Sequence, residues 1–121
     1  MITVEKVHES EGKIVFDVKF ASPKSPLDLL CYATIVDCGN YLRVCNLYTP
    51  LGYRKMGFAT YIMEWIFKNF PLDTYVEADT YEIDTNHSGM SDKKLREWYL
   101  SLGFEFIPNH PFSMVKRKLL N

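Results

Sequence analysis

The stretch that decides the fold covers residues 47–60 and reads Leu47-Tyr48-Thr49-Pro50-Leu51-Gly52-Tyr53-Arg54-Lys55-Met56-Gly57-Phe58-Ala59-Thr60. An apolar strand end leads into a turn containing Pro50 and Gly52, and a cationic pair then precedes a helix that begins with small residues. The first N–H groups of a helix have no intrahelical partner and lie at the positive end of its dipole, so they bind phosphate groups. The stretch therefore predicts an anion-binding junction between a strand and a helix.

Four strands are predicted before this junction. Residues 13–20 alternate apolar and polar side chains, which is typical of a half-buried strand, and residues 2–5 do so over a shorter length. An almost continuous apolar run at 29–36 predicts a covered strand after a proline-containing loop at 22–28. Turn residues then predict a hairpin whose returning arm is 41–48.

Two helices alternate with strands after the junction. A helix is predicted over 57–70 because its polar residues recur every four positions. A second helix begins at Ser91 or Asp92 and ends at Gly103. The remaining strands are predicted at 74–80, 104–107 and 112–119. This order predicts one α/β or α+β domain over 1–121 with a strand-helix-strand unit at its centre.

Composition limits the class of protein. The chain has 14 Lys plus Arg and 15 Asp plus Glu, a formal charge of -1, which excludes a strongly basic nucleic-acid binder. No stretch is apolar enough to span a membrane and the N-terminus has no signal sequence, so a cytoplasmic protein is expected. Cys31, Cys38 and Cys45 show no metal-ligand spacing and are expected to be buried or half-buried free thiols.

Two sequence patterns carry the chemistry. The first is Arg-x-x-Gly-x-Ala at Arg54, Gly57 and Ala59, which is neither a Walker A loop nor GxGxxG. The second, further along the chain, is Trp98-Tyr99-Leu100-Ser101-Leu102-Gly103-Phe104. In this order and with a strand between them, the two patterns resemble the signatures of the GNAT superfamily, the Gcn5-related N-acetyltransferases.

The resemblance implies the GNAT fold, with a central mixed, mostly antiparallel, twisted sheet and a strand-helix-strand-helix core that binds the cofactor. The family usually has one or two helices between its first two strands. Here only the loop at 22–28 is found in that part of the chain, so the N-terminal helices are expected to be reduced or absent, as in small phage-type members. Those helices normally help to form the acceptor site, and the acceptor is therefore left open.

The resemblance also implies acetyl-CoA as co-substrate and no metal. In the family, a bulge in the fourth strand exposes backbone groups that pair with pantetheine, and the amides that open the next helix hold the pyrophosphate. The residues expected to bind the cofactor here are Leu47, Tyr48, Arg54, Lys55, Met56, Gly57, Phe58, Ala59 and Thr60.

Acetyl transfer to an amine needs a neutral amine and a proton for the departing thiolate. By its place in the second pattern, Tyr99 is the candidate proton donor, with packing or cofactor positioning as the alternative. Glu77 is the candidate general base ahead of Asp79, because it lies nearer the middle of the predicted strand; His87 and a water chain to solvent are alternatives. A run of acids that would border the acceptor side comprises Glu77, Asp79, Glu82 and Asp84.

The predicted function is an acyl-CoA-dependent N-acyltransferase that moves acetyl to a protein lysine, an N-terminus or a small-molecule amine. A noncatalytic CoA-binding protein of the same fold, or an inhibitor or adaptor that uses its aromatic residues at an interface, remains an alternative. The basic run at 116–118 reads as a solvated edge of the last strand rather than a nucleic-acid site. The same strand is the candidate contact for a homodimer.

Overall fold

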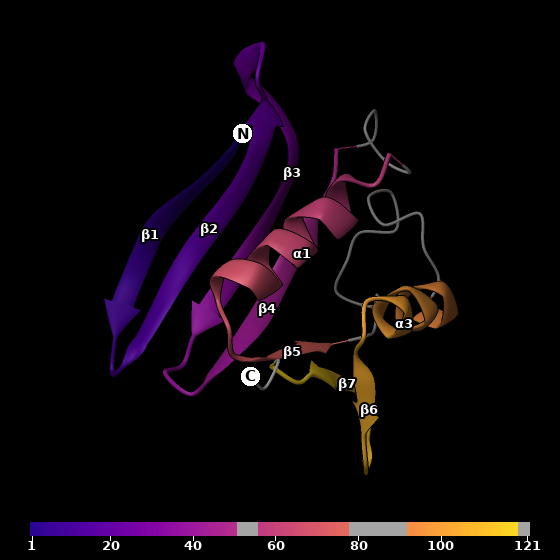
Figure 1. Cartoon of the computed structure of the whole chain (residues 1–121). Helices are drawn as coiled ribbons and strands as arrows, with labels where there is room; N and C mark the ends of the chain where they lie inside the picture. Colours follow the sequence, from indigo (N-terminus) through magenta and orange to yellow (C-terminus); the bar gives the residue numbers. More distant parts are fainter. Residues whose placement is uncertain (51–55, 78–91, 119–121) are drawn as a thin grey trace.

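The computed structural model describes residues 1–50, 56–77 and 92–118, and within them it contains seven strands and two helices (Figure 1). These are β1 (Ile2–Ser10), β2 (Lys13–Ser22), β3 (Ser25–Asp37), β4 (Tyr41–Tyr48), α1 (Phe58–Asn69), β5 (Asp73–Glu77), α3 (Asp92–Ser101), β6 (Glu105–Ile107) and β7 (His110–Lys116). The predicted order of elements and the α+β class are confirmed.

The predicted loop at 22–28 is wrong. The turn at 23–24 is tight, and β3 begins at Ser25, which pairs with Ser22. Because Ala21 then pairs with Leu29, the intervening residues of β3 form an irregularity in the ladder. A proline is tolerated at such a place, since no regular ladder hydrogen bond is lost there.

The strands form one sheet in the order β1-β2-β3-β4-β5-β7-β6. All neighbours are antiparallel except β4 and β5, which are parallel and therefore need the crossover that α1 supplies. β7 lies between β5 and β6, so its backbone pairs on both sides. The predictions that the last strand is a solvated edge and a dimer contact through strand pairing are both wrong for this reason.

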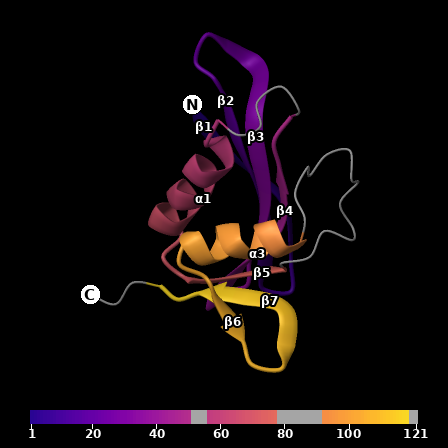
Figure 2. The ribbon, with the colours of Figure 1, turned by 90° about the vertical axis from the view of Figure 1, so that its right-hand side faces the viewer.

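Both helices contribute to a single core. α1 packs against β3 and β2, and α3 lies near β5, β6 and β7 (Figures 1 and 2). Ile62, Met63 and Ile66 of α1 are fully buried, whereas Glu64 and Lys68 on its opposite side are exposed, as the four-residue spacing predicts. Buried Leu95 and Tyr99 and the half-buried Trp98 of α3 join the same cluster, as does the half-buried Leu102 directly after the helix.

The other face of the sheet is not covered by either helix. Along β4 and β5, buried residues alternate with half-buried or exposed ones, so side chains such as Arg43, Tyr75 and Glu77 lie on the uncovered face. β1 and β2 are joined only by the turn at Glu11 and Gly12, both with positive φ. The prediction that the N-terminal helices are reduced or absent is thus confirmed. The place where the family has them corresponds to the β1–β2 turn and not to residues 22–28.

No helix within the described ranges is long and apolar enough to cross a membrane.

Candidate active site

A β-bulge interrupts β4. Thr34 of β3 pairs with Asn46, and the next residue, Ile35, pairs with Val44, so Cys45 is an extra residue in the ladder. A bulge bends its strand and re-aims the side chains on either side of it. Cys45 is exposed here, and the expectation that every cysteine is at least half-buried is therefore wrong; Cys31 is buried and Cys38 half-buried.

The bulge lies where the described pairing of β4 with β5 ends, and we call this place the opening between the two strands. The two strands pair from Tyr41 with Asp73 up to Val44 with Val76. Beyond Val44, β4 continues its ladder with β3, but its residues 45–47 have no partner in β5 among the residues that the structure describes. Where β4 has no partner in the described part of β5, its backbone N–H and C=O groups on that side are candidates to hydrogen-bond a ligand.

Leu47 and Tyr48 lie just past the opening. Leu47 packs against the core, and its backbone pairs with Ala33 of β3. Tyr48 pairs with Tyr32 across the same ladder, with ring centroids 5.6 Å apart on the uncovered face. The bulge is thus two residues before the segment that sequence analysis assigned to pantetheine.

The N-terminus of α1 lies where the sequence predicts an anion-binding junction. Gly57 is the N-cap, has φ 81°, and forms no side-chain cap hydrogen bond. The first helical bond runs from the Tyr61 N–H to the Gly57 carbonyl at 3.0 Å, so the amides of Ala59 and Thr60 precede it. A Cβ built on Gly57 meets no atom of residues 1–50, 56–77 or 92–118 within 4 Å.

The other residues assigned to this loop divide into two groups. Met56 is 60% exposed. The ring centroids of Phe58 and Phe20 lie 5.6 Å apart, and this contact holds the start of α1 against the sheet. Arg54 and Lys55 lie outside the described residues.

A side-chain hydrogen bond joins the two sequence patterns. The Trp98 indole Nε1–H donates to Thr60 Oγ1 at 3.1 Å, across 38 positions of sequence. Thr60 is in the first turn of α1, so this bond couples α3 to the proposed phosphate site. The sequence offers no separate signal for it, because both residues are accounted for by their helical periodicity.

Tyr99 is buried in the core, with 6% of its surface exposed. The centroid of its ring lies 5.2 Å from the ring centroid of Trp98 and 5.2 Å from that of Phe104. The Tyr99 carbonyl accepts a hydrogen bond from the Phe104 N–H. The chain turns between these two residues at Gly103, which has φ 99°. Within the described part of the chain its hydroxyl makes no hydrogen bond. Burial raises the pKa of the Tyr99 phenol to about 12, so the phenol stays protonated at neutral pH.

Glu77 is exposed at the end of the described part of β5. Ser113 of β7 lies opposite it in the ladder, and the Ser113 hydroxyl is 3.1 and 3.2 Å from the two carboxylate oxygens, to which it donates its single hydrogen. The alternatives Asp79 and His87 lie outside the described residues, as do Glu82 and Asp84.

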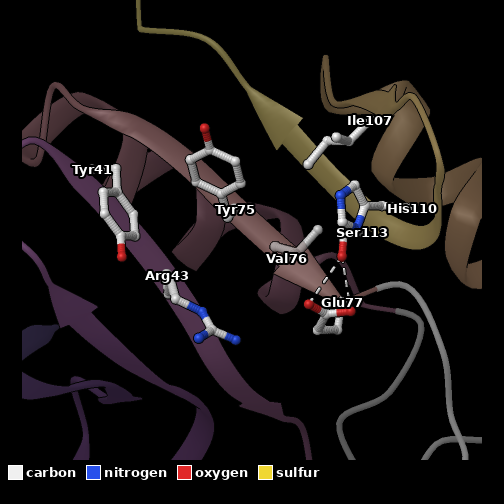
Figure 3. A pocket seen from close by; sticks show the side chains of 8 residues that line it. All are labelled: Tyr41, Arg43, Tyr75, Val76, Glu77, Ile107, His110 and Ser113. Carbon is white, nitrogen blue, oxygen red and sulfur yellow. Dashed lines mark hydrogen bonds between the residues drawn. The ribbon is translucent and has the colours of Figure 1, made fainter.

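Glu77 lines a groove of about 440 Å³ on the uncovered face of the sheet (Figure 3). The groove lies across β4, β5 and β7 and is lined by Tyr41, Arg43, Tyr75, Val76, Glu77, Ile107, His110 and Ser113. No sequence pattern identifies Arg43 or Ser113 as a site residue. The alternation of 41–48 indicates that Arg43 faces outward, but only the pairing of β7 with β5 brings Ser113 to Glu77.

The residues of the C-terminal basic run are engaged within the chain. Lys116 donates to the Leu102 carbonyl at 2.9 Å, and Arg117 lies 3.3 Å from Asp73 and 3.4 Å from Glu105. These contacts connect the end of β7 to α3, β5 and β6.

Across residues 1–50, 56–77 and 92–118 no group of three or more His, Cys, Asp or Glu side chains could hold a metal ion.

No protein-family model matches the chain, and no curated protein matches its sequence. Its structure does match solved structures. A putative acetyltransferase of the GNAT family from Bacteroides thetaiotaomicron superposes with a TM-score of 0.61 at 13% identity, over 88% of this chain and 63% of that one. This chain has a GNAT-like fold.

Two further structures share this GNAT-like fold. The anti-CRISPR protein AcrVA5 matches with a TM-score of 0.57 at 17% identity, over 70% of this chain and 87% of its own. A chain from the structure of a KacTA-DNA complex matches with a TM-score of 0.58 at 15% identity, over 91% of this chain and 70% of its own. The fold predicted from the two sequence patterns is therefore confirmed.

Proposed function

We propose that the protein is an acyl-CoA-dependent N-acyltransferase that transfers acetyl from acetyl-CoA to an amine. The observation that carries this proposal is the opening between β4 and β5 at the Cys45 bulge, next to an uncapped helix N-terminus. The opening offers backbone hydrogen bonds to an extended chain, and the helix start offers amides to a pyrophosphate.

Two features of the described residues fit this co-substrate. No atom of the described residues would hinder a phosphate beside Gly57 from approaching the amides of Ala59 and Thr60. The buried Tyr99 hydroxyl lacks a hydrogen bond among the described residues, a state that costs about 1–3 kcal/mol unless a ligand or water supplies a partner. Arg54 and Lys55 add positive charge by their sequence position.

The chemistry requires two proton movements. Acetyl-CoA would supply the acetyl group as a thioester. The amine nitrogen attacks the thioester carbonyl carbon and forms the C–N bond of a tetrahedral intermediate, and the C–S bond breaks when this intermediate collapses. Glu77, directly or through water, accepts the proton that the amine loses, and Tyr99 donates the proton that the departing sulfur takes up. Backbone N–H groups in segment 45–48 stabilise the developing oxyanion.

Acetyl as the natural acyl group and a cytoplasmic setting are parts of the same proposal. The alternative is a CoA-binding protein of this fold without transferase activity. It is favoured by the aromatic surroundings of Tyr99, because those contacts suit a packing role as well as a proton donor.

A thermal-shift experiment tests the binding step. Acetyl-CoA is expected to raise the Tm of the protein, by an amount that grows with its concentration. Gly57→Trp should abolish the increase, because the indole would fill the space where the phosphate approaches. Dephospho-CoA measures the share contributed by the 3′-phosphate.

Gly12→Trp is the matched control. Gly12 also has positive φ (78°) and nothing within 4 Å of a built Cβ, but it lies in the β1–β2 turn. The strain of a Trp at positive φ is thus similar in the two variants. An unchanged Tm for the unmutated protein, or the same loss of shift in both variants, would contradict the proposed site.

A further inference from the structure

The groove on the uncovered face adjoins the opening between β4 and β5. Val44 and Val76 form the last pair before the opening, and Glu77 is the next residue of β5. Glu77 therefore lies at the end of the groove nearest the proposed reaction centre, while Tyr41 lies at its other end, where β4 begins (Figure 3).

Two opposite charges lie in the groove without neutralising each other. Arg43 pairs with Tyr75 in the ladder, and Glu77 is two residues further along β5. A strand spacing of about 4.8 Å and a rise of about 3.3 Å per residue place the Arg43 and Glu77 Cα atoms about 8 Å apart. Neither side chain forms an ion pair with any residue in the described ranges, and the partner of Glu77 is the neutral Ser113.

The groove that holds these charges also has apolar lining residues. The rings of Tyr41 and Tyr75 meet edge to face at 5.5 Å, and Val76 and Ile107 complete the surface. Such a lining favours contact with methylene groups rather than with another charge. An anion-binding side chain and a cation-binding carboxylate thus share one face of the sheet with an apolar surface beside them.

We propose that this groove binds the acceptor and selects amines that also carry a carboxylate, separated from the nitrogen by a chain of methylene groups, with the ammonium at Glu77 and the carboxylate at Arg43. This inference rests on the proposed function and specifies its substrate class. Two sources supply this chemistry: a free ω-amino acid, or a lysine beside an acidic residue in a polypeptide.

Binding in the absence of acetyl-CoA tests the groove directly. NMR titration with 6-aminohexanoate and with 1,6-diaminohexane compares ligands of matched length that differ in the carboxylate. The unmutated protein is expected to bind 6-aminohexanoate about tenfold more tightly or better, as charge-assisted hydrogen bonds allow. Arg43→Gln should remove this preference, and Glu77→Gln should weaken the binding of both ligands.

Lys19→Gln serves as the control, because Lys19 is a partly exposed cation of β2 that is paired with Glu5 and does not line the groove. It should keep the preference. Equal binding of the two ligands by the unmutated protein, or a preference that survives in Arg43→Gln, would overturn the proposed groove.

An acetyl-transfer experiment distinguishes a free ω-amino acid from a lysine beside an acidic residue as the acceptor. Labelled acetyl-CoA is offered with 6-aminohexanoate, and with a peptide, blocked at both ends, that has lysine beside glutamate or beside glutamine. Faster labelling of the glutamate peptide identifies a polypeptide source, and labelling of 6-aminohexanoate alone identifies a small acid. Selective binding without any transfer would overturn the acceptor role, whereas transfer that Arg43→Gln leaves equally selective would overturn the groove and keep the transferase.

Discussion

At the scale of single residues, a substitution that removes the Tyr99 hydroxyl distinguishes the proposed transferase from a CoA-binding protein without transferase activity. Tyr99→Phe removes a proton donor and leaves the ring contacts with Trp98 and Phe104 in place. We expect kcat to fall by about 100-fold or more, the usual contribution of general acid catalysis, with acetyl-CoA affinity nearly unchanged. The Tm should stay the same or rise, because a buried hydroxyl with no partner in the described structure is lost.

Steady-state kinetics and a binding titration on the same preparation check this prediction. Tyr61→Phe, which removes a half-exposed hydroxyl from α1, is the control and should alter neither quantity. Lost affinity with unchanged kcat would instead make Tyr99 a residue that positions the cofactor.

At the scale of elements, the bulge in β4 is predicted to be needed for function and not for folding. Leu42 and Val44 face the core before the bulge and Leu47 faces it afterwards, so the inward positions change parity at Cys45. Deleting Cys45 restores regular alternation without moving an apolar side chain to the other face. The deletion variant should fold with an equal or higher Tm and lose acetyl transfer, because regular pairing with β5 can extend.

Circular dichroism, Tm and a transfer assay check this expectation. Cys45→Ser keeps the bulge and should retain both stability and activity. An active deletion variant would show that the opening is not required, and an unfolded one would show that the bulge belongs to the fold itself.

At the scale of the whole molecule, Asp73 joins the start of β5 to the end of the chain. Its carboxylate accepts the Lys118 N–H at 2.8 Å and lies 3.3 Å from Arg117. The backbone hydrogen bond from Lys118 and the nearby Arg117 lower the pKa of Asp73. A carboxylate with a lowered folded-state pKa stabilises the protein above its unfolded pKa of about 3.9, and this stability is lost as the pH falls further.

Asp73→Asn should therefore lower Tm at pH 6 by more than at pH 2.5. The Tm values of the variant and of the unmutated protein are expected to converge as the pH falls. Thermal melts across this range check the prediction. Glu97→Gln, at an exposed carboxylate of α3, should show no such convergence. A Tm difference that is independent of pH would mean that the Asp73 charge does not contribute.

Local patterns predicted most of the architecture because they report on local physics. The alternation of β2, the four-residue spacing of α1 and the Gly103 stop of α3 each reflect how a few neighbouring residues divide between core and solvent. The exposed Cys45 was not predicted, although the parity change between Val44 and Leu47 is a sequence signal for a bulge. The position of the last strand was not predicted either, since an internal short strand and an edge strand have similar patterns.

The sequence by itself determined the order of elements, the two patterns that point to a GNAT fold and the glycine at the start of α1, because each depends on residues close together in the chain. The tertiary structure alone decided that β7 lies inside the sheet, that Trp98 bonds Thr60, and that Ser113 holds Glu77 in a groove with Arg43. These contacts join segments brought together only by sheet order and helix packing, which depend on the burial of the whole core.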